Sequence, residues 1–267
     1  MNQYQAIFPD QRLQIVAAGL TATGQFTLHN DDAFALHDSS RSEGAAHYGQ
    51  LYLLADGRGS NGAGGVASRM AIETISTVYY EQSDALSPLS RLQQAFLAAH
   101  ARVSDYANTH SKDQVMTTCI AAAIKGNKCW IGHIGDSRAY LVRSHSEQPI
   151  RRLTTDHSWL AKQMRAIPGH LRSISNPPET HDILLRALGI PESQMFYPDF
   201  VIVTLRAGDA LLLCSDGLWQ ALTEEQMARI VSEHTPEQAC HLLIRQANAR
   251  SESENISAVV LSFQETV

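Results

Sequence analysis

The sequence has little of several features that would each identify a class of protein. Its four cysteines, Cys119, Cys129, Cys214 and Cys240, form no Cys-x-x-Cys pair, so no cysteine-type zinc site is indicated. No apolar run reaches the roughly 18 residues of a membrane-spanning helix, and the N-terminus has neither a basic region nor a long apolar stretch. We therefore expect a cytoplasmic protein that does not span a membrane.

Basic residues are also scarce. The chain has 21 Lys and Arg against 27 Asp and Glu, a formal net charge of -6, which argues against a nucleic-acid-binding protein. No catalytic triad and no His-Glu-x-x-His motif is recognisable, so the sequence indicates no protein nucleophile and no protease-type zinc site. The length of 267 residues and the 44% of hydrophobic residues are those of an ordinary globular protein with a substantial core.

Apolar patterns predict strands and paired helices. Two capping boxes, Thr223-Glu-Glu-Gln226 and Thr235-Pro-Glu-Gln238, begin the last two helices. Because the helices come in pairs and do not alternate with strands, we expect an α+β architecture of antiparallel sheets with helices outside. The predicted strands are 12–20, 32–37, 48–55, 117–124, 128–135, 138–143, 200–205, 209–214 and 256–263, and the predicted helices are 66–82, 88–108, 224–233 and 236–249.

Residues 159–184 show little strand pattern. They contain Pro168-Gly169 and Asn176-Pro177-Pro178, which favour turns and irregular structure. We expect a surface flap or small subdomain here, more mobile than the strands around it.

Three aspartates lie at the ends of apolar runs, in the motifs Asp56-Gly57, Asp136-Ser137 and Asp216-Gly217, and Glu254 opens the last run. A single Asp-Gly pair after a strand is usually a turn. Three such strand ends can instead hold several carboxylates rigidly, and carboxylate oxygens are the ligands that hard divalent cations prefer. The pattern therefore predicts a binuclear metal site.

Taken in chain order, these motifs resemble the metal-dependent protein phosphatases of the PP2C type, most closely the compact bacterial ones. The resemblance extends from about Gly24 to Phe263. It rests on Asn30-Asp31-Asp32-Ala33, Ala55-Asp56-Gly57-Arg58-Gly59, Gly64, Ala67-Ser68, Thr117-Thr118, Gly135-Asp136-Ser137-Arg138, Leu153-Thr154-Thr155-Asp156-His157-Ser158, Arg186-Ala187-Leu188-Gly189, Cys214-Ser215-Asp216-Gly217-Leu218 and Glu254-Asn255-Ile256-Ser257.

The resemblance implies a fold, an activity and a cofactor. The fold would be a four-layer α-β-β-α sandwich over residues 1–267. The activity would be hydrolysis of phosphoserine and phosphothreonine in proteins, by a water activated between two Mn²⁺ or Mg²⁺ ions with a position for a third. The protein would act as a monomer on phosphorylated proteins, the products of a partner Ser/Thr kinase in bacterial signalling.

The resemblance also implies a role for each site residue. Asp56 would bridge both metals, and Gly57 would bind one of them through its backbone carbonyl. Asp216 and Glu254 would be further ligands, and Asp136 would bind a third, weaker ion. Asp56 and Asp216 would thus be the residues essential for catalysis. The neighbouring acids Asp31 and Asp32 would hold metal-bound waters.

The chain departs from the family pattern at four positions. Thr27 stands where the family usually has a phosphate-binding arginine, and a hydroxyl cannot replace a bidentate guanidinium. Arg58, where Met or His is common, could supply the missing cation as a substrate-binding residue. Gly65 stands where Glu is frequent, and Glu254 replaces the final aspartate. Two alternatives therefore stay open: a catalytically weakened regulatory or binding module, and a two-metal hydrolase of small phosphoesters.

Overall fold

The computed structural model describes residues 13–38, 43–109, 114–144, 146, 148–159, 161–162, 183–190, 196–250 and 254–265. Most of the expected flap, residues 163–182, lies outside the described residues, so its mobility stays a prediction. Among the described helices, none is both long and apolar enough to cross a lipid bilayer.

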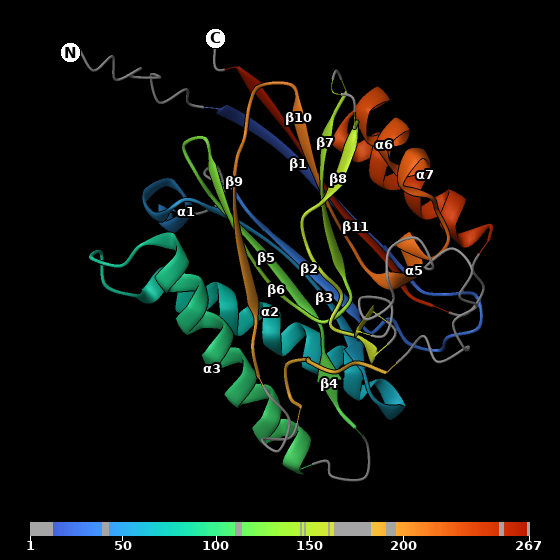
Figure 1. The fold of residues 1–267 in the computed structure, drawn as a ribbon. Helices are drawn as coiled ribbons and strands as arrows, with labels where there is room; N and C mark the ends of the chain where they lie inside the picture. The colour runs from blue at the N-terminus through green and yellow to red at the C-terminus, as the bar shows by residue number, and fades with distance from the viewer. Residues whose placement is uncertain are drawn as a thin grey trace.

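Two antiparallel sheets form the centre of the molecule (Figure 1). One has the strand order β1-β11-β10-β7-β8, and the other has the order β2-β3-β5-β6-β9, with β4 paired to β3. The strands are β1 (Leu13–Ala22), β2 (Asp32–His37), β3 (Gln50–Arg58), β4 (Met116–Thr117), β5 (Cys119–Lys125), β6 (Lys128–Ile134), β7 (Arg138–Arg143), β8 (Ile150–Arg152), β9 (Asp199–Thr204), β10 (Asp209–Cys214) and β11 (Ile256–Glu265).

Helices cover the outer faces of both sheets. The long helices α2 (Ala63–Glu81) and α3 (Pro88–Thr109) lie on one side, and α6 (Glu224–Glu233) and α7 (Pro236–Asn248) lie on the other (Figure 1). Both predicted capping boxes are present, at Thr223 and Thr235. The predicted α-β-β-α sandwich is therefore confirmed. The short helices α1 (Glu43–Tyr48) and α5 (Asp216–Trp219) and the 3₁₀ turn η1 (Ser60–Gly62) were not predicted.

The sequence of β10 shows why the layers form. Leu211 and Leu213 pack in the cluster between the two sheets, whereas Leu212 and Cys214 pack in the cluster beneath α6 and α7. Alternate side chains point to opposite faces of a strand, so a strand buried on both faces needs an unbroken apolar run. All four cysteines are free and buried.

The strand that carries Asp56 begins and ends later than predicted, and its later end lies at the candidate site. We expected a strand over 48–55, but β3 runs to Arg58 because Gly57 and Arg58 pair with Thr117 and Met116 of β4. The Asp56-Gly57-Arg58 run therefore has a fixed extended backbone and is not a free turn. It lies at the same end of the sandwich as α5 and the β6–β7 turn (Figure 1).

Candidate active site

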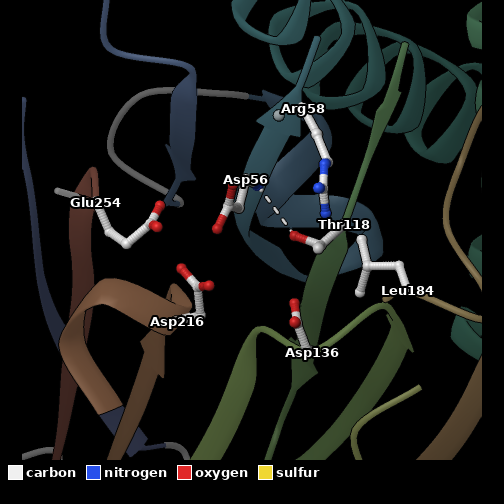
Figure 2. A pocket seen from close by; sticks show the side chains of 8 residues that line it. Asp56, Arg58, Thr118, Asp136, Leu184, Asp216 and Glu254 are labelled. Atoms are coloured by element: carbon white, nitrogen blue, oxygen red, sulfur yellow. Dashed lines mark hydrogen bonds between the residues drawn. The ribbon is translucent and has the colours of Figure 1, made fainter. Parts of the chain in front are cut away.

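A cavity of about 220 Å³ at this end of the sandwich gathers most of the predicted site residues. Figure 2 shows the carboxylates of Asp56, Asp136, Asp216 and Glu254 pointing into one space. They come from β3, the β6–β7 turn, α5 and the segment just before β11. The residues lining the cavity are Asp56, Gly57, Arg58, Thr118, Asp136, Leu184, Asp216 and Glu254.

Two threonines hold the backbone of Asp56. The Asp56 N–H donates to Thr118 Oγ1 over 3.0 Å, and the Asp56 carbonyl accepts from the Thr118 N–H over 2.8 Å and from Thr117 Oγ1 over 2.9 Å. Thr118 Oγ1 also lies 2.8 Å from Ser137 Oγ, next to Asp136. Thr118 thus joins the strand of Asp56 to the turn of Asp136.

Gly57 is required by the close approach of α2. A Cβ at Gly57 would lie 2.0 Å from the Gly64 carbonyl oxygen, closer than any side chain can approach. Only glycine lets the first turn of α2 pack against the end of β3. This contact holds the Gly57 backbone, whose carbonyl the family resemblance assigns to a metal.

Glu254 and Asp216 lie on two segments bound to each other. The Ser257 N–H donates to Ser215 Oγ over 2.9 Å, and the Ser215 N–H donates to the Ser257 carbonyl over 3.2 Å. The Asn255 amide binds the loop before β2, accepting from the Asp31 N–H and donating to Thr27 Oγ1. Thr27 is thus held by Asn255, on the segment before β11.

Asp31 and Asp32 do not line the cavity. Asp31 Oδ1 accepts from the Gly65 N–H over 2.8 Å at the start of α2, and a Cβ at Gly65 would lie only 2.9 Å from that oxygen. Asp32 is 6% exposed and pairs with Asp56 across β2 and β3. Its Oδ2 accepts from Ser257 Oγ, whereas Oδ1 has no partner among the described residues. A water-holding role therefore stays a prediction for both residues.

The carboxylates disfavour one another's charge. Burial, and then the charges of Asp32, Asp216 and Asp136, raise the pKa of Asp56 well above its usual range. Burial and the neighbouring Asp216 raise the pKa of Asp136 to about 8. Burial raises the pKa of Asp32 to about 7. Arg58 is the only cationic side chain among the described cavity residues, so the site has an excess of negative charge.

This donor set fits hard divalent cations. Within the described parts of the chain, no three His, Cys, Asp or Glu side chains are already close enough together to hold an ion by themselves. Mg²⁺ and similar ions take one or two carboxylates and complete their coordination with carbonyls and waters. Carboxylates spread around a polar cavity, with the unpartnered Asp32 Oδ1 behind them, suit that kind of binding.

Three residues at or near the site were missed by sequence reasoning. Thr118 and Leu184 line the cavity, and Trp219 donates its indole N–H to the Asp136 carbonyl over 3.0 Å. Thr118 belongs to a recognised motif, which could have pointed to it. Leu184 and Trp219 are apolar residues in no recognised pattern, and only the fold brings them there.

Comparisons with known proteins agree with this geometry. The family model for protein phosphatase 2C matches residues 25–253. The serine/threonine phosphatase stp of Listeria monocytogenes is 30% identical over 246 residues, which cover 90% of this chain and 93% of that protein. The protein phosphatase PhpP of Streptococcus pneumoniae is 29% identical over 252 residues, covering 92% and 96%.

One solved structure is similar to nearly the whole of this chain. It is the catalytic domain of the serine/threonine protein phosphatase PstP in complex with two manganese ions, with a TM-score of 0.77 and 26% identity, covering 95% of this chain and 100% of that one. With the motif order, the fold and the family match in agreement, the chain belongs to the protein phosphatase 2C family of metal-dependent protein phosphatases.

Proposed function

We propose that the protein hydrolyses phosphoserine and phosphothreonine in other proteins, using a water activated at a binuclear Mn²⁺ or Mg²⁺ site. The observation that supports this most is the convergence of four carboxylates on one cavity that offers no Ser, Cys or His nucleophile among its described lining residues. The relatives named as serine/threonine phosphatases, and the manganese ions bound to PstP, support the substrate class and the cofactor.

Each carboxylate of the cavity would have its own role in metal binding. The Asp56 carboxylate points into the cavity toward Asp216 and would bind both ions (Figure 2). Gly57, which also lines the cavity, would bind one of them through its backbone carbonyl. Asp216 and Glu254 would bind from the opposite wall, and Asp136 would hold a third, weaker ion. Bound divalent ions supply a water of lowered pKa and offset the charge that develops on the phosphoryl oxygens.

Arg58 would bind the outer oxygens of the substrate phosphate. Figure 2 shows its side chain extending along the cavity wall toward Thr118. A guanidinium in this position can hold a phosphate through charge-assisted hydrogen bonds. Thr27, at the position of the family's usual arginine, hydrogen-bonds instead to the Gly24 carbonyl and to Asn255.

Three further statements are proposals from the sequence alone. The protein would act in the cytoplasm, it would act as a monomer, and its substrates would be products of a partner Ser/Thr kinase. The chain would also form a single domain, with a flap at about 159–184.

A side-by-side assay tests the function. Metal-stripped protein is given Mn²⁺ and either a phosphothreonine peptide or an aryl phosphate, and phosphate release is followed with and without a chelator. We expect release from both substrates, abolished by the chelator. Release from the aryl phosphate alone would favour a hydrolase of small phosphoesters. Release from neither would favour a regulatory or binding module.

A further inference from the structure

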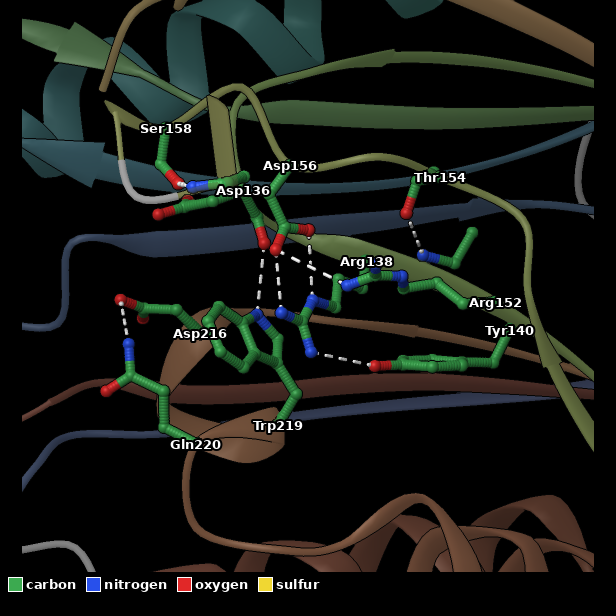
Figure 3. A network of polar contacts seen from close by, with 12 residues as sticks. Asp136, Arg138, Tyr140, Arg152, Thr154, Asp156, Ser158, Asp216, Trp219 and Gln220 are labelled. Carbon is green, nitrogen blue, oxygen red and sulfur yellow. Dashed lines mark hydrogen bonds and ion pairs between the residues drawn. The ribbon is translucent and has the colours of Figure 1, made fainter. Parts of the chain in front are cut away.

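The turn that carries Asp136 is held by Trp219 (Figure 3) and by His157, two residues with no part in the proposed chemistry. Trp219 donates its indole N–H to the Asp136 carbonyl over 3.0 Å. On the other side, the His157 N–H donates to the Gly135 carbonyl over 2.8 Å, and the Gly135 N–H donates to His157 Nδ1 over 3.2 Å. The backbone on both sides of the Gly135–Asp136 peptide is therefore fixed.

The indole of Trp219 is itself held in place. The guanidinium carbon of Arg138 lies 3.4 Å from the centre of the Trp219 ring. Arg138 binds Asp156 through two parallel hydrogen bonds of 3.0 and 2.6 Å, and its side chain is only 15% exposed. A buried bidentate pair of this kind is rigid, and the guanidinium stacked on an aromatic face adds further attraction. Trp219 thus has little freedom to turn away from Asp136.

Trp219 shares the short helix α5 with Asp216, so its hydrogen bond to Asp136 concerns both carboxylates. Asp216 begins the short helix α5 and Trp219 ends it, so the two residues move as one unit. Asp136 is 8% exposed, and its carboxylate and that of Asp216 point into the same space, so their like charges favour separation of the two segments (Figure 2). The indole hydrogen bond opposes that separation by joining the turn of one carboxylate to the helix of the other.

We propose that Trp219 is a positioning residue that fixes Asp136 relative to Asp216, and so sets the affinity for the cation that Asp136 binds. The inference rests on the proposed function, in which Asp136 is a ligand of the weaker ion. Carboxylates held in place before binding give up little freedom when the cation arrives, whereas a loosened turn must be ordered first.

Calorimetric titration of the full, metal-stripped chain with Mn²⁺ tests the proposal directly. Trp219→Phe keeps an aromatic ring for Arg138 to stack on and removes the indole N–H together with the five-membered ring that carries it. We expect it to weaken one binding event about three- to tenfold, the scale of one hydrogen bond. The other events and kcat at saturating Mn²⁺ should stay near wild type. Trp219→Leu, which also removes the ring, should weaken the same event further.

Trp130→Phe is the matched control. Trp130 lies on β6, packs against the cluster beneath α2 and α3, and takes no part in the cavity lining. Its titration should match wild type. A Trp219→Phe titration superimposable on wild type would overturn the proposal. So would equal weakening of every event together with a lower melting temperature of the metal-free protein, because that result describes general loosening.

Asp136→Asn separates this inference from the function on which it rests. If Asp136→Asn and Trp219→Phe weaken the same event, both assignments are supported. If Asp136→Asn leaves all binding events unchanged while phosphate release still requires Mn²⁺, the inference fails and the phosphatase function stands. If wild type binds no Mn²⁺ and releases no phosphate, the proposed function itself fails.

Discussion

At the scale of single residues, we expect substrate affinity to depend on Arg58. It follows Asp56-Gly57 directly, and its side chain lines the cavity that holds the carboxylates. Arg58→Ala should raise KM for a phosphothreonine peptide. The resulting fall in kcat/KM should correspond to a loss of about 1.5–3 kcal/mol of transition-state stabilisation, the scale of a hydrogen bond to a charged group. Steady-state kinetics on the peptide would measure this.

Arg102→Ala is a suitable control, because Arg102 contacts Glu73 and Thr74 on the outer helices and lies outside the cavity lining. Thr27→Arg in the Arg58→Ala background should recover part of the lost affinity. An Arg58→Ala enzyme with wild-type kcat/KM would leave the phosphate without an arginine contact and would strengthen the case for a weakened phosphatase.

For Glu254, the packing of the backbone indicates whether a shorter side chain would raise or lower the Mn²⁺ requirement. A Cβ at Gly24 would lie 2.4 Å from the Glu254 carbonyl, and a Cβ at Gly217 would lie 2.4 Å from the Asn255 carbonyl. The backbone at Glu254 is thus packed on both sides and cannot advance to follow a shorter side chain. Glu254→Asp should therefore raise the Mn²⁺ concentration for half-maximal activity about three- to tenfold, with an unchanged fold.

Activity measured against Mn²⁺ concentration would show the Glu254→Asp effect, with Glu233→Asp at the exposed end of α6 as the control. A curve that coincides with wild type would mean that Glu254 is not a ligand.

At the scale of elements, the contact between β3 and α2 supports the site. Gly57→Ala would place a methyl group 2.0 Å from the Gly64 carbonyl, so the strand end and the helix must separate. We expect a loss of about 1–3 kcal/mol of unfolding free energy, typical of overpacking, together with weaker Mn²⁺ binding. Chemical denaturation in the presence of a chelator measures the first effect, and calorimetry measures the second.

Gly208→Ala provides the comparison. Gly208 has φ near +87° but no neighbour within 4 Å of a Cβ, so its replacement adds backbone strain without a clash. It should cost about 1–2 kcal/mol and leave Mn²⁺ binding unchanged. If Gly57→Ala behaved in the same way, the β3–α2 contact would not position the site.

The elements also show what the sequence could predict. The capping boxes at Thr223 and Thr235 and the apolar run of β10 are local signals, and the structure confirms all three. The two-residue β4 depends on pairing with β3, a non-local contact that no short pattern encodes. The helix α5 is four residues long, too short for a periodic pattern.

At the candidate site too, residues in local motifs were predicted, whereas contacts between distant parts of the chain were not. Asp56, Asp136 and Asp216 were predicted because each stands in a motif at a strand end, and the fold brings them into one cavity. Asp31 is expected to hold a metal-bound water, and this stays a prediction, because its described contact is with the Gly65 N–H at the start of α2. Trp219 reaches Asp136 across 83 positions of sequence, a contact that the non-local pairing of β7 with β10 creates.

At the scale of the whole molecule, the clustered carboxylates link stability to pH and metal. The pKa values of Asp136 and Asp32, raised by burial to about 8 and about 7, exceed the usual 3.8. The native state therefore binds protons that the unfolded state releases, so stability of the metal-free protein falls as pH rises toward 8. Burial lowers the pKa of His133 from 6.5 to about 3, so this residue makes stability rise with pH, mostly below pH 6.5.

Thermal unfolding between pH 6.5 and 8.5 isolates this contribution. With a chelator present, the melting temperature should fall across the window. With saturating Mn²⁺, the decline should shrink or reverse, because the ion replaces the protons and binds better as they leave. A metal-free protein whose stability rises with pH in this window would contradict the described charge cluster.

The central claim is that hydrolysis needs metal ions held by Asp56 and Asp216. The most direct test is phosphate release from a phosphothreonine peptide as Mn²⁺ is added to metal-stripped wild type, Asp56→Asn and Asp216→Asn. Wild-type release should rise from the background to a plateau. Both variants should stay orders of magnitude lower while keeping a cooperative unfolding transition. Full activity of either variant in metal-stripped buffer would contradict the two-metal account.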